Sequence, residues 1–172
     1  MDTFVEQLVK KQSTSADMLK RAGIVGLGAL LFVLIIRFSR YLGVFSMIGY
    51  LLSAGVLYGA YYLWTSLNIE YEYILTNDEI DIDKIVAQRK RNRLLTVNIR
   101  DFEQFGLYNA AEHAQDEERT KVFACSSPTA PNAYYATFTH RKYGKTLLVF
   151  NPDIRIVEGV KKFLPAQKIQ NL

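Results

Sequence analysis

Two long stretches without a charged side chain constrain this chain more than any other feature of its sequence. No charge lies between Arg21 and Arg37, and none lies between Arg40 and Glu70. A helix needs about 20 apolar residues to cross a bilayer, and the second stretch easily suffices. The apolar residues 22–36 reach only about 22 Å, so the first helix needs flanking side chains that snorkel to the surface. We therefore predict a hairpin of two membrane-spanning helices.

The hairpin is expected in residues 16–67, with spans at about residues 19–37 and 41–66. A cleaved signal peptide is the alternative for the first span, but the sequence RFSRY that follows it has no small-residue cleavage site. Basic residues are more frequent before the first span than in the turn: Lys10, Lys11, Lys20 and Arg21 against Arg37 and Arg40. The positive-inside rule therefore predicts a two-span protein of the cell membrane with both termini in the cytoplasm.

Small and aromatic residues add detail to the two spans. Small residues spaced four apart permit close approach of helices, and here they are Ala22, Gly26, Gly49, Ser53, Gly55 and Gly59. We expect them to pack the two helices together within one chain, with a homo-oligomer as the alternative. Amphipathic rings favour the headgroup level of a bilayer, which predicts an interface belt of Tyr58, Tyr61, Tyr62 and Trp64. No Asp, Glu, Lys, Arg or His lies between Arg21 and Arg37 or between Arg40 and Glu70, which argues against an ion pathway through the spans.

Residues 1–15 precede the hairpin. Apolar side chains recur there at helical spacing, at Phe4, Val5, Leu8 and Val9. This pattern predicts a short amphipathic helix on the membrane surface, and a frayed terminus is the alternative.

Residues 68–172 form the expected extramembrane domain. Alternating apolar side chains predict a β-hairpin over residues 69–83 with a turn at Asn77 and Asp78. Further strands are expected at residues 94–99, 121–126, 133–140 and 146–150. A helix should follow, with Asn151 as its N-cap, Ile154, Val157, Val160 and Leu164 on one face, and Pro165 at its end. The predicted class is an α+β membrane protein: a helical hairpin, then a small antiparallel β-barrel or sandwich with a C-terminal capping helix.

Three short motifs link this pattern to a family. The chain resembles an uncharacterised bacterial family of two-helix membrane proteins with a pleckstrin-homology-like domain, through Glu-Tyr-Glu-Tyr at residues 70–73, Asp-Ile-Asp-Lys-Ile at 81–85 and Arg-Lys-Arg at 89–91. The resemblance implies a cytoplasmic pleckstrin-homology-like domain over residues 68–172. It implies no catalytic motif.

The titratable residues give little support to a reaction. Cys125 is the only cysteine, which excludes an internal disulfide, and nucleotide-binding and hydrolase motifs are absent. A thiol enzyme centred on Cys125 with His140 or His113 is an alternative, but an ordinary buried cysteine is preferred. The acidic run Asp78, Glu79, Asp81 and Asp83 lacks the glycine and terminal glutamate of a calcium loop and is expected to be solvated. We expect no cofactor and no metal.

The stretch VAQRKRNRLL contains a basic run of Arg89, Lys90, Arg91 and Arg93. Its neighbours predict a turn between strands. The domain as a whole is nearly neutral, which argues against nucleic acid as a partner. Two hypotheses stay open: a turn that contacts anionic lipid headgroups, and a turn that docks a protein or is merely solvated. The sequence favours a membrane-anchored scaffold or protein-interaction module with an unidentified protein partner, and an anionic-lipid sensor is the alternative.

Overall fold

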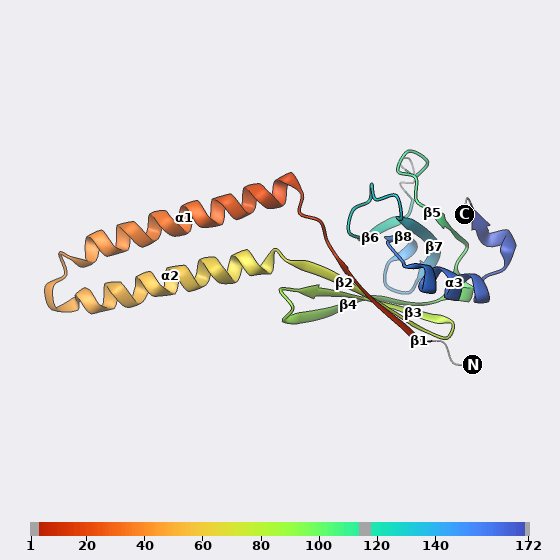
Figure 1. Ribbon diagram of the computed structural model, residues 1–172, viewed down its shortest axis with the longest axis horizontal. Helices are drawn as coiled ribbons and strands as arrows, with labels where there is room; N and C mark the ends of the chain where they lie inside the picture. Colours follow the sequence, from red (N-terminus) through yellow and green to blue (C-terminus); the bar gives the residue numbers. More distant parts are fainter. Residues whose placement is uncertain (1–3, 114–117, 171–172) are drawn as a thin grey trace. The chain divides into compact units, whose positions relative to one another are not determined.

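The computed structural model describes residues 4–113 and 118–170, and the chain divides into two compact units (Figure 1). One unit is residues 13–68. The other joins the segment before residue 13 to the segment from residue 69 onward.

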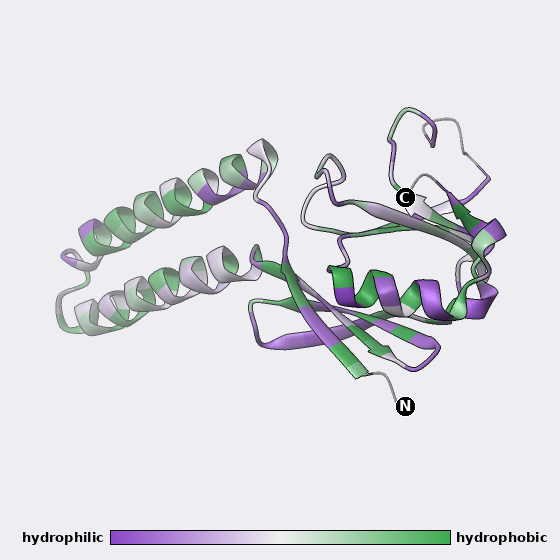
Figure 2. Cartoon of the chain, turned by 45° about the vertical axis from the view of Figure 1, so that its right-hand side comes forward, coloured by the Kyte–Doolittle hydropathy of each residue, from purple (hydrophilic) through white to green (hydrophobic). Residues whose placement is uncertain are grey.

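The first unit is a helical hairpin. Helix α1 spans Ser15–Ser39, a short 3-10 turn spans Gly43–Phe45, and helix α2 spans Ser46–Ser66. Thr14 caps α1, because its hydroxyl accepts a hydrogen bond from Asp17 N at 3.2 Å while the Asp17 carboxylate accepts one from Thr14 N. The 25 residues of α1 extend about 37 Å, more than the apolar stretch alone provides. By length and composition, both helices can cross a membrane. Figure 2 shows that they are mostly apolar.

The second unit begins with a four-stranded antiparallel sheet in the order β1-β2-β3-β4. Its strands are β1 (Phe4–Lys10), β2 (Ile69–Thr76), β3 (Glu79–Val86) and β4 (Lys90–Asn98). The predicted β-hairpin of β2 and β3 is confirmed, with Asn77 in the left-handed region at φ 54°. Side chains alternate between an inner face that joins the core and an outer face that includes Glu6, Leu8 and Glu72.

Strand β1 corrects the expectation for residues 1–15, because the described part is neither a surface helix nor a frayed terminus. It pairs with β2 along its whole length, from Phe4 opposite Thr76 to Lys10 opposite Glu70. The same apolar positions fit a strand, since Val5 and Val9 lie on one face and Phe4 and Leu8 on the other. The partner strand follows the hairpin, so a local pattern could not reveal the pairing.

The remaining strands form a mixed sheet in the order β6-β8-β7-β5-β9. They are β5 (Gln104–Leu107), β6 (Thr120–Ala124), β7 (Tyr134–His140), β8 (Gly144–Phe150) and β9 (Ile169–Gln170). The predicted strands 133–140 and 146–150 are confirmed as β7 and β8. The described strands form two separate sheets, so the closed barrel is wrong. The pairs β5–β9 and β6–β8 are parallel, because long connections bring β6 and β9 back to an edge of the sheet.

Helix α3 (Ile154–Phe163) follows β8, with a 3-10 turn at Ala166–Lys168 after it. Its N-cap is Asp153, which accepts a hydrogen bond from Ile156 N at 3.0 Å, and not Asn151. Ile154 is exposed, whereas Ile156, Val157 and Val160 are buried. Both sheets and α3 share one core, whose fully buried large side chains include Tyr73, Leu75, Ile80, Ile82, Phe102, Phe105, Phe138 and Phe150.

Candidate functional site

The basic run does not form the turn that the sequence predicts. The turn lies at residues 87–89, where Arg89 N donates to Val86 O at 3.1 Å, and Lys90, Arg91 and Arg93 belong to strand β4. Ala87 and Gln88 both adopt left-handed backbone angles, with φ of 54° and 56°. Alanine and glutamine are not typical residues for that conformation. For this reason the turn was predicted at the more polar residues that follow.

Arg91 and Arg93 form ion pairs across the outer face of the sheet. The Arg91 guanidinium donates a hydrogen bond to Glu72 Oε1 at 2.9 Å and lies 2.8 Å from Oε2. Arg93 lies 3.3 Å from both Asp81 and Asp83. The sheet register explains these pairs, because Asp83 is opposite Glu72 on one side and Arg93 on the other. The two arginines are therefore neutralised by carboxylates of the neighbouring strands.

The carboxylates beneath these arginines are buried. The side chains of Glu72 and Asp83 are each 3% exposed, whereas those of Arg91 and Arg93 are more than half exposed. Burial raises the pKa of Glu72, the positive charge of Arg91 opposes that rise, and a hydrogen bond with the Glu6 side chain adds to it. The expectation that Asp83 is solvated is wrong, because Arg93 covers it. Glu72 was not predicted as a site residue, because the sequence showed it only as part of the Glu-Tyr-Glu-Tyr motif in an alternating strand.

A groove of about 390 Å³ lies beside this ion-pair network. It combines two apolar side chains with charged and amide groups, and its lining is Leu8, Glu70, Glu72, Ile85, Gln88, Arg89 and Arg91. Gln88 donates a hydrogen bond to Glu70 at 3.3 Å. The groove carries both signs of charge, so it does not present a purely basic surface.

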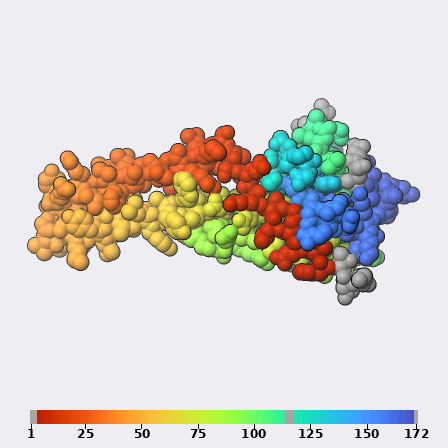
Figure 3. Space-filling view, viewed as in Figure 1, coloured from red at the N-terminus to blue at the C-terminus, as the bar shows by residue number. Residues whose placement is uncertain are grey.

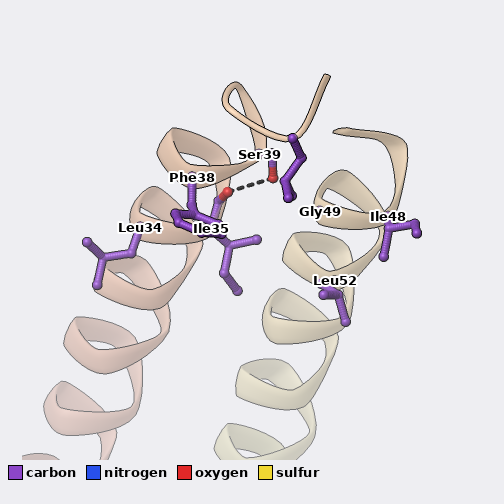
Figure 4. Close-up of a pocket in the computed structure, with 8 residues that line it drawn as sticks. Leu34, Ile35, Phe38, Ser39, Ile48, Gly49 and Leu52 are labelled. Atoms are coloured by element: carbon purple, nitrogen blue, oxygen red, sulfur yellow. Dashed lines mark hydrogen bonds between the residues drawn. The ribbon is translucent and has the colours of Figure 1, made fainter. Parts of the chain in front are cut away.

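In the hairpin unit, the predicted small residues divide into two groups. Gly49 and Ser53 are buried, and a Cβ at Gly49 would overlap Ser39 Oγ. Ser39 donates to Ile35 O at 2.6 Å, and Figure 4 shows this bond beside a groove of about 440 Å³ between the two helices. A Cβ at Gly26, Gly55 or Gly59 would meet nothing within 4 Å, and Ala22 is exposed.

Sequence analysis missed Gly28, which packs against Ala60, where an added Cβ would lie 3.1 Å from the alanine Cβ. Its neighbours at four-residue spacing are large, so the small-residue pattern did not include it. Homo-oligomerisation through the exposed glycines stays a prediction.

The predicted belt residues lie near the end of α2. Tyr58, Tyr61 and Tyr62 are exposed, and Trp64 is partly covered by the Arg21 guanidinium, 5.3 Å from the ring centroid. Arg21 also donates to Asn68 Oδ1 at 2.8 Å. This arginine therefore ties the start of α1 to the end of α2. The interface belt of Tyr58, Tyr61, Tyr62 and Trp64 stays a prediction.

The candidate thiol site lacks the features of an activated cysteine. Cys125 is buried among Ala133, Tyr135, Leu147 and Val149, and burial raises the pKa of its thiol to about 11. A nucleophilic cysteine needs the opposite shift. His113 stacks against Tyr108. His140, the last residue of β7, stacks against Tyr143. Among the described residues, no group of three or more His, Cys, Asp or Glu side chains is placed to hold a metal ion.

Comparisons with known proteins place the chain in context. A family model described as "Bacterial PH-like domain (DUF6106)" matches residues 1–170. No curated protein and no solved structure matches the chain.

Proposed function

The chain belongs to this family of bacterial PH-like domains, and from that premise we propose that it is a membrane-anchored interaction module without catalytic activity. The family match includes the helical hairpin as well as the two sheets. The anchor is the hairpin, and the module is the unit built from β1 to β9 with α3.

The pairing of β1 with β2 is the observation that carries the proposal. These strands lie immediately before and after the hairpin, and Lys11 N donates to Ile69 O at 3.0 Å where the paired strands end. Two strands of one sheet must lie on the same side of a membrane. The chain between them therefore crosses an even number of times, which is consistent with two spans. The basic residues before α1 favour the cytoplasmic side for the sheets.

The ion-pair network supports protein docking over lipid binding. A basic surface attracts anionic headgroups by about 1 kcal/mol per accessible charge, but Arg91 and Arg93 already face Asp81, Asp83 and Glu72. Two of the four basic residues of the run are therefore already paired with carboxylates. The mixed charge and apolar lining of the adjacent groove fit a peptide surface better than a phosphate. The partner is therefore proposed to be a protein.

Cysteine labelling of the full chain in intact cells tests the anchor. Cys125 is replaced by alanine, and one new cysteine is introduced at exposed Arg40 in the hairpin turn or at exposed Lys142 in the β7–β8 turn. A membrane-impermeant maleimide should label Arg40→Cys before lysis and Lys142→Cys only after lysis. The reverse pattern would refute the orientation. Equal labelling of the two before lysis would refute a two-span anchor.

A further inference from the structure

The side-chain pattern of β1 allows more than one alignment with β2. The inner face carries Val5, Gln7 and Val9, and the outer face carries Phe4, Glu6, Leu8 and Lys10. A shift by one residue would turn every side chain to the wrong face. A shift by two keeps valines inside and charges outside. Alternation alone therefore does not select the observed register.

Gln7 distinguishes these registers. It is the polar residue of the inner face and lies opposite Tyr73. Its amide nitrogen donates to Asn151 O at 3.0 Å, and its amide oxygen accepts from Asp153 N at 2.7 Å. Both partners lie just before α3, where Asn151 N also donates to Tyr73 Oη at 3.2 Å. Figure 3 shows residues of β1, in red, against the blue residues near the C-terminal end of the chain.

A two-residue shift would remove both contacts of Gln7. The amide would face Leu75 or Tyr71 in place of Tyr73, and a valine would face Asn151 and Asp153. Backbone groups left without a partner in a half-buried position cost free energy, as does an amide placed among apolar side chains. Hydrogen bonding at one residue therefore penalises every register that hydrophobic alternation permits.

We propose that Gln7 is a positioning residue that locks β1 in one register against β2. A two-residue slip moves β1 by about 6.6 Å, more than one helical turn of about 5.4 Å. Only residues 11–14 separate β1 from α1. The inference stands independently of any docking partner.

Disulfide trapping in the full chain, reconstituted in bilayers with Cys125 replaced by alanine, tests the lock. Opposite residues of an antiparallel ladder alternate between hydrogen-bonded and non-hydrogen-bonded pairs, and Lys11 with Ile69 is a hydrogen-bonded pair. The pairs on the outer face are therefore non-hydrogen-bonded. Their Cα atoms lie close together, which favours a disulfide. Glu6→Cys with Ile74→Cys reports the observed register. Leu8→Cys with Glu70→Cys reports a two-residue shift toward the hairpin. Closure is measured by loss of thiols that react with a polyethylene-glycol maleimide.

The parent chain should close the Glu6–Ile74 pair preferentially. Gln7→Val should reduce that preference by about tenfold or more, the factor that two net hydrogen bonds supply. The double variant Val5→Gln with Gln7→Val moves the amide by two residues and should make the Leu8–Glu70 pair the preferred one. Glu6→Gln, on the outer face, serves as the control in the Leu8–Glu70 background and should leave that pair as slow to close as in the parent. An unchanged preference in both Gln7 variants would overturn the proposal. A variant that fails to fold would close neither pair. Closure of the Leu8–Glu70 pair in the double variant therefore separates a shifted register from misfolding.

Discussion

Replacing Arg91 by methionine should destabilise the domain more than neutralising its partner Glu72. The Glu72 side chain is 3% exposed and that of Arg91 is 55% exposed. Loss of Arg91 leaves a buried carboxylate without its nearest cation. Breaking a fully buried pair costs about 3–5 kcal/mol, and the solvent exposure of Arg91 reduces the expected cost to about 2 kcal/mol. Glu72→Gln keeps the shape of the side chain and leaves Arg91 in water near Asp83, so its expected cost is about 0–1 kcal/mol.

The pH dependence of the Arg91→Met penalty follows from the same asymmetry. Burial already raises the pKa of Glu72 above 4.5, and Arg91 opposes that rise. Without Arg91 the folded-state pKa rises further, while the unfolded-state pKa does not change. Such a carboxyl group contributes its full stability below the unfolded-state pKa and loses it as pH rises through the folded-state pKa. The penalty should therefore be small below about pH 4.5 and grow toward neutral pH.

Urea unfolding followed by near-ultraviolet circular dichroism measures these effects in a variant that lacks the hairpin. Because Lys11 and Ile69 form a hydrogen-bonded pair, a two-residue Asn-Gly turn can join them and close β1 on β2. Adding Glu72→Gln to Arg91→Met should restore about 1–2 kcal/mol, since the buried charge that lost its nearest cation is then removed, while Asp83 keeps its ion pair with Arg93. Equal costs for the two single variants, or a penalty independent of pH, would refute this explanation.

Three further predictions concern the same unit. The Asn-Gly variant should unfold cooperatively in urea, whereas residues 68–172 alone should not, because they lack β1. If the two proteins showed the same unfolding transition, β1 would be dispensable for the fold. Gly159→Ala should lower the free energy of unfolding in urea by about 1–3 kcal/mol, because its Cβ would overlap Leu75 Cδ2 in the core. This loss should exceed the gain from the better helix propensity of alanine. Glu158→Ala, at an exposed position, is the control, and an equal effect of the two variants would exclude overpacking. Ala87→Gly should raise the free energy of unfolding by about 1 kcal/mol, and with it the urea midpoint, because φ is 54° there. A lower midpoint would show that the methyl group contributes packing.

Local patterns predicted the elements whose partners are adjacent in the sequence. Strands β2 and β3 are joined by a short turn and alternate apolar and polar residues over most of their length. Strands β7 and β8 are also joined by a short turn, and they are rich in aromatic and β-branched residues. Helix α3 was also predicted, but its N-cap lies two residues later than expected. Asn151 has a different role, because its side chain accepts from Ser126 N at 2.7 Å and donates to Asn132 O at 3.0 Å. Those partners depend on tertiary structure, which capping preferences do not include.

The candidate site was harder to predict because its parts come from three strands. Four basic residues within five positions resembled a solvated turn, and the acidic residues of β3 resembled a solvated strand face. Register brings the two sets together, and Arg93 then covers the Asp83 carboxylate while remaining exposed itself. A one-residue irregularity between Ile82 and Asp83 also shifts β4 relative to β3. Such a bulge changes which side chains face each other and leaves no local sequence signal.

The position of the hairpin between two paired strands links membrane insertion to folding of the sheets. Strand β1 is synthesised first, but its partner β2 appears only after both helices, so the pair forms late and across a long loop. If only one helix crossed a membrane, β1 and β2 would lie on opposite sides and could not pair. The unpaired β2 would then expose its edge, and Tyr73 and Asn151 would lose their neighbour Gln7. Correct folding of the sheets therefore requires both ends of the hairpin on one side, which makes the fold itself a check on the proposed topology.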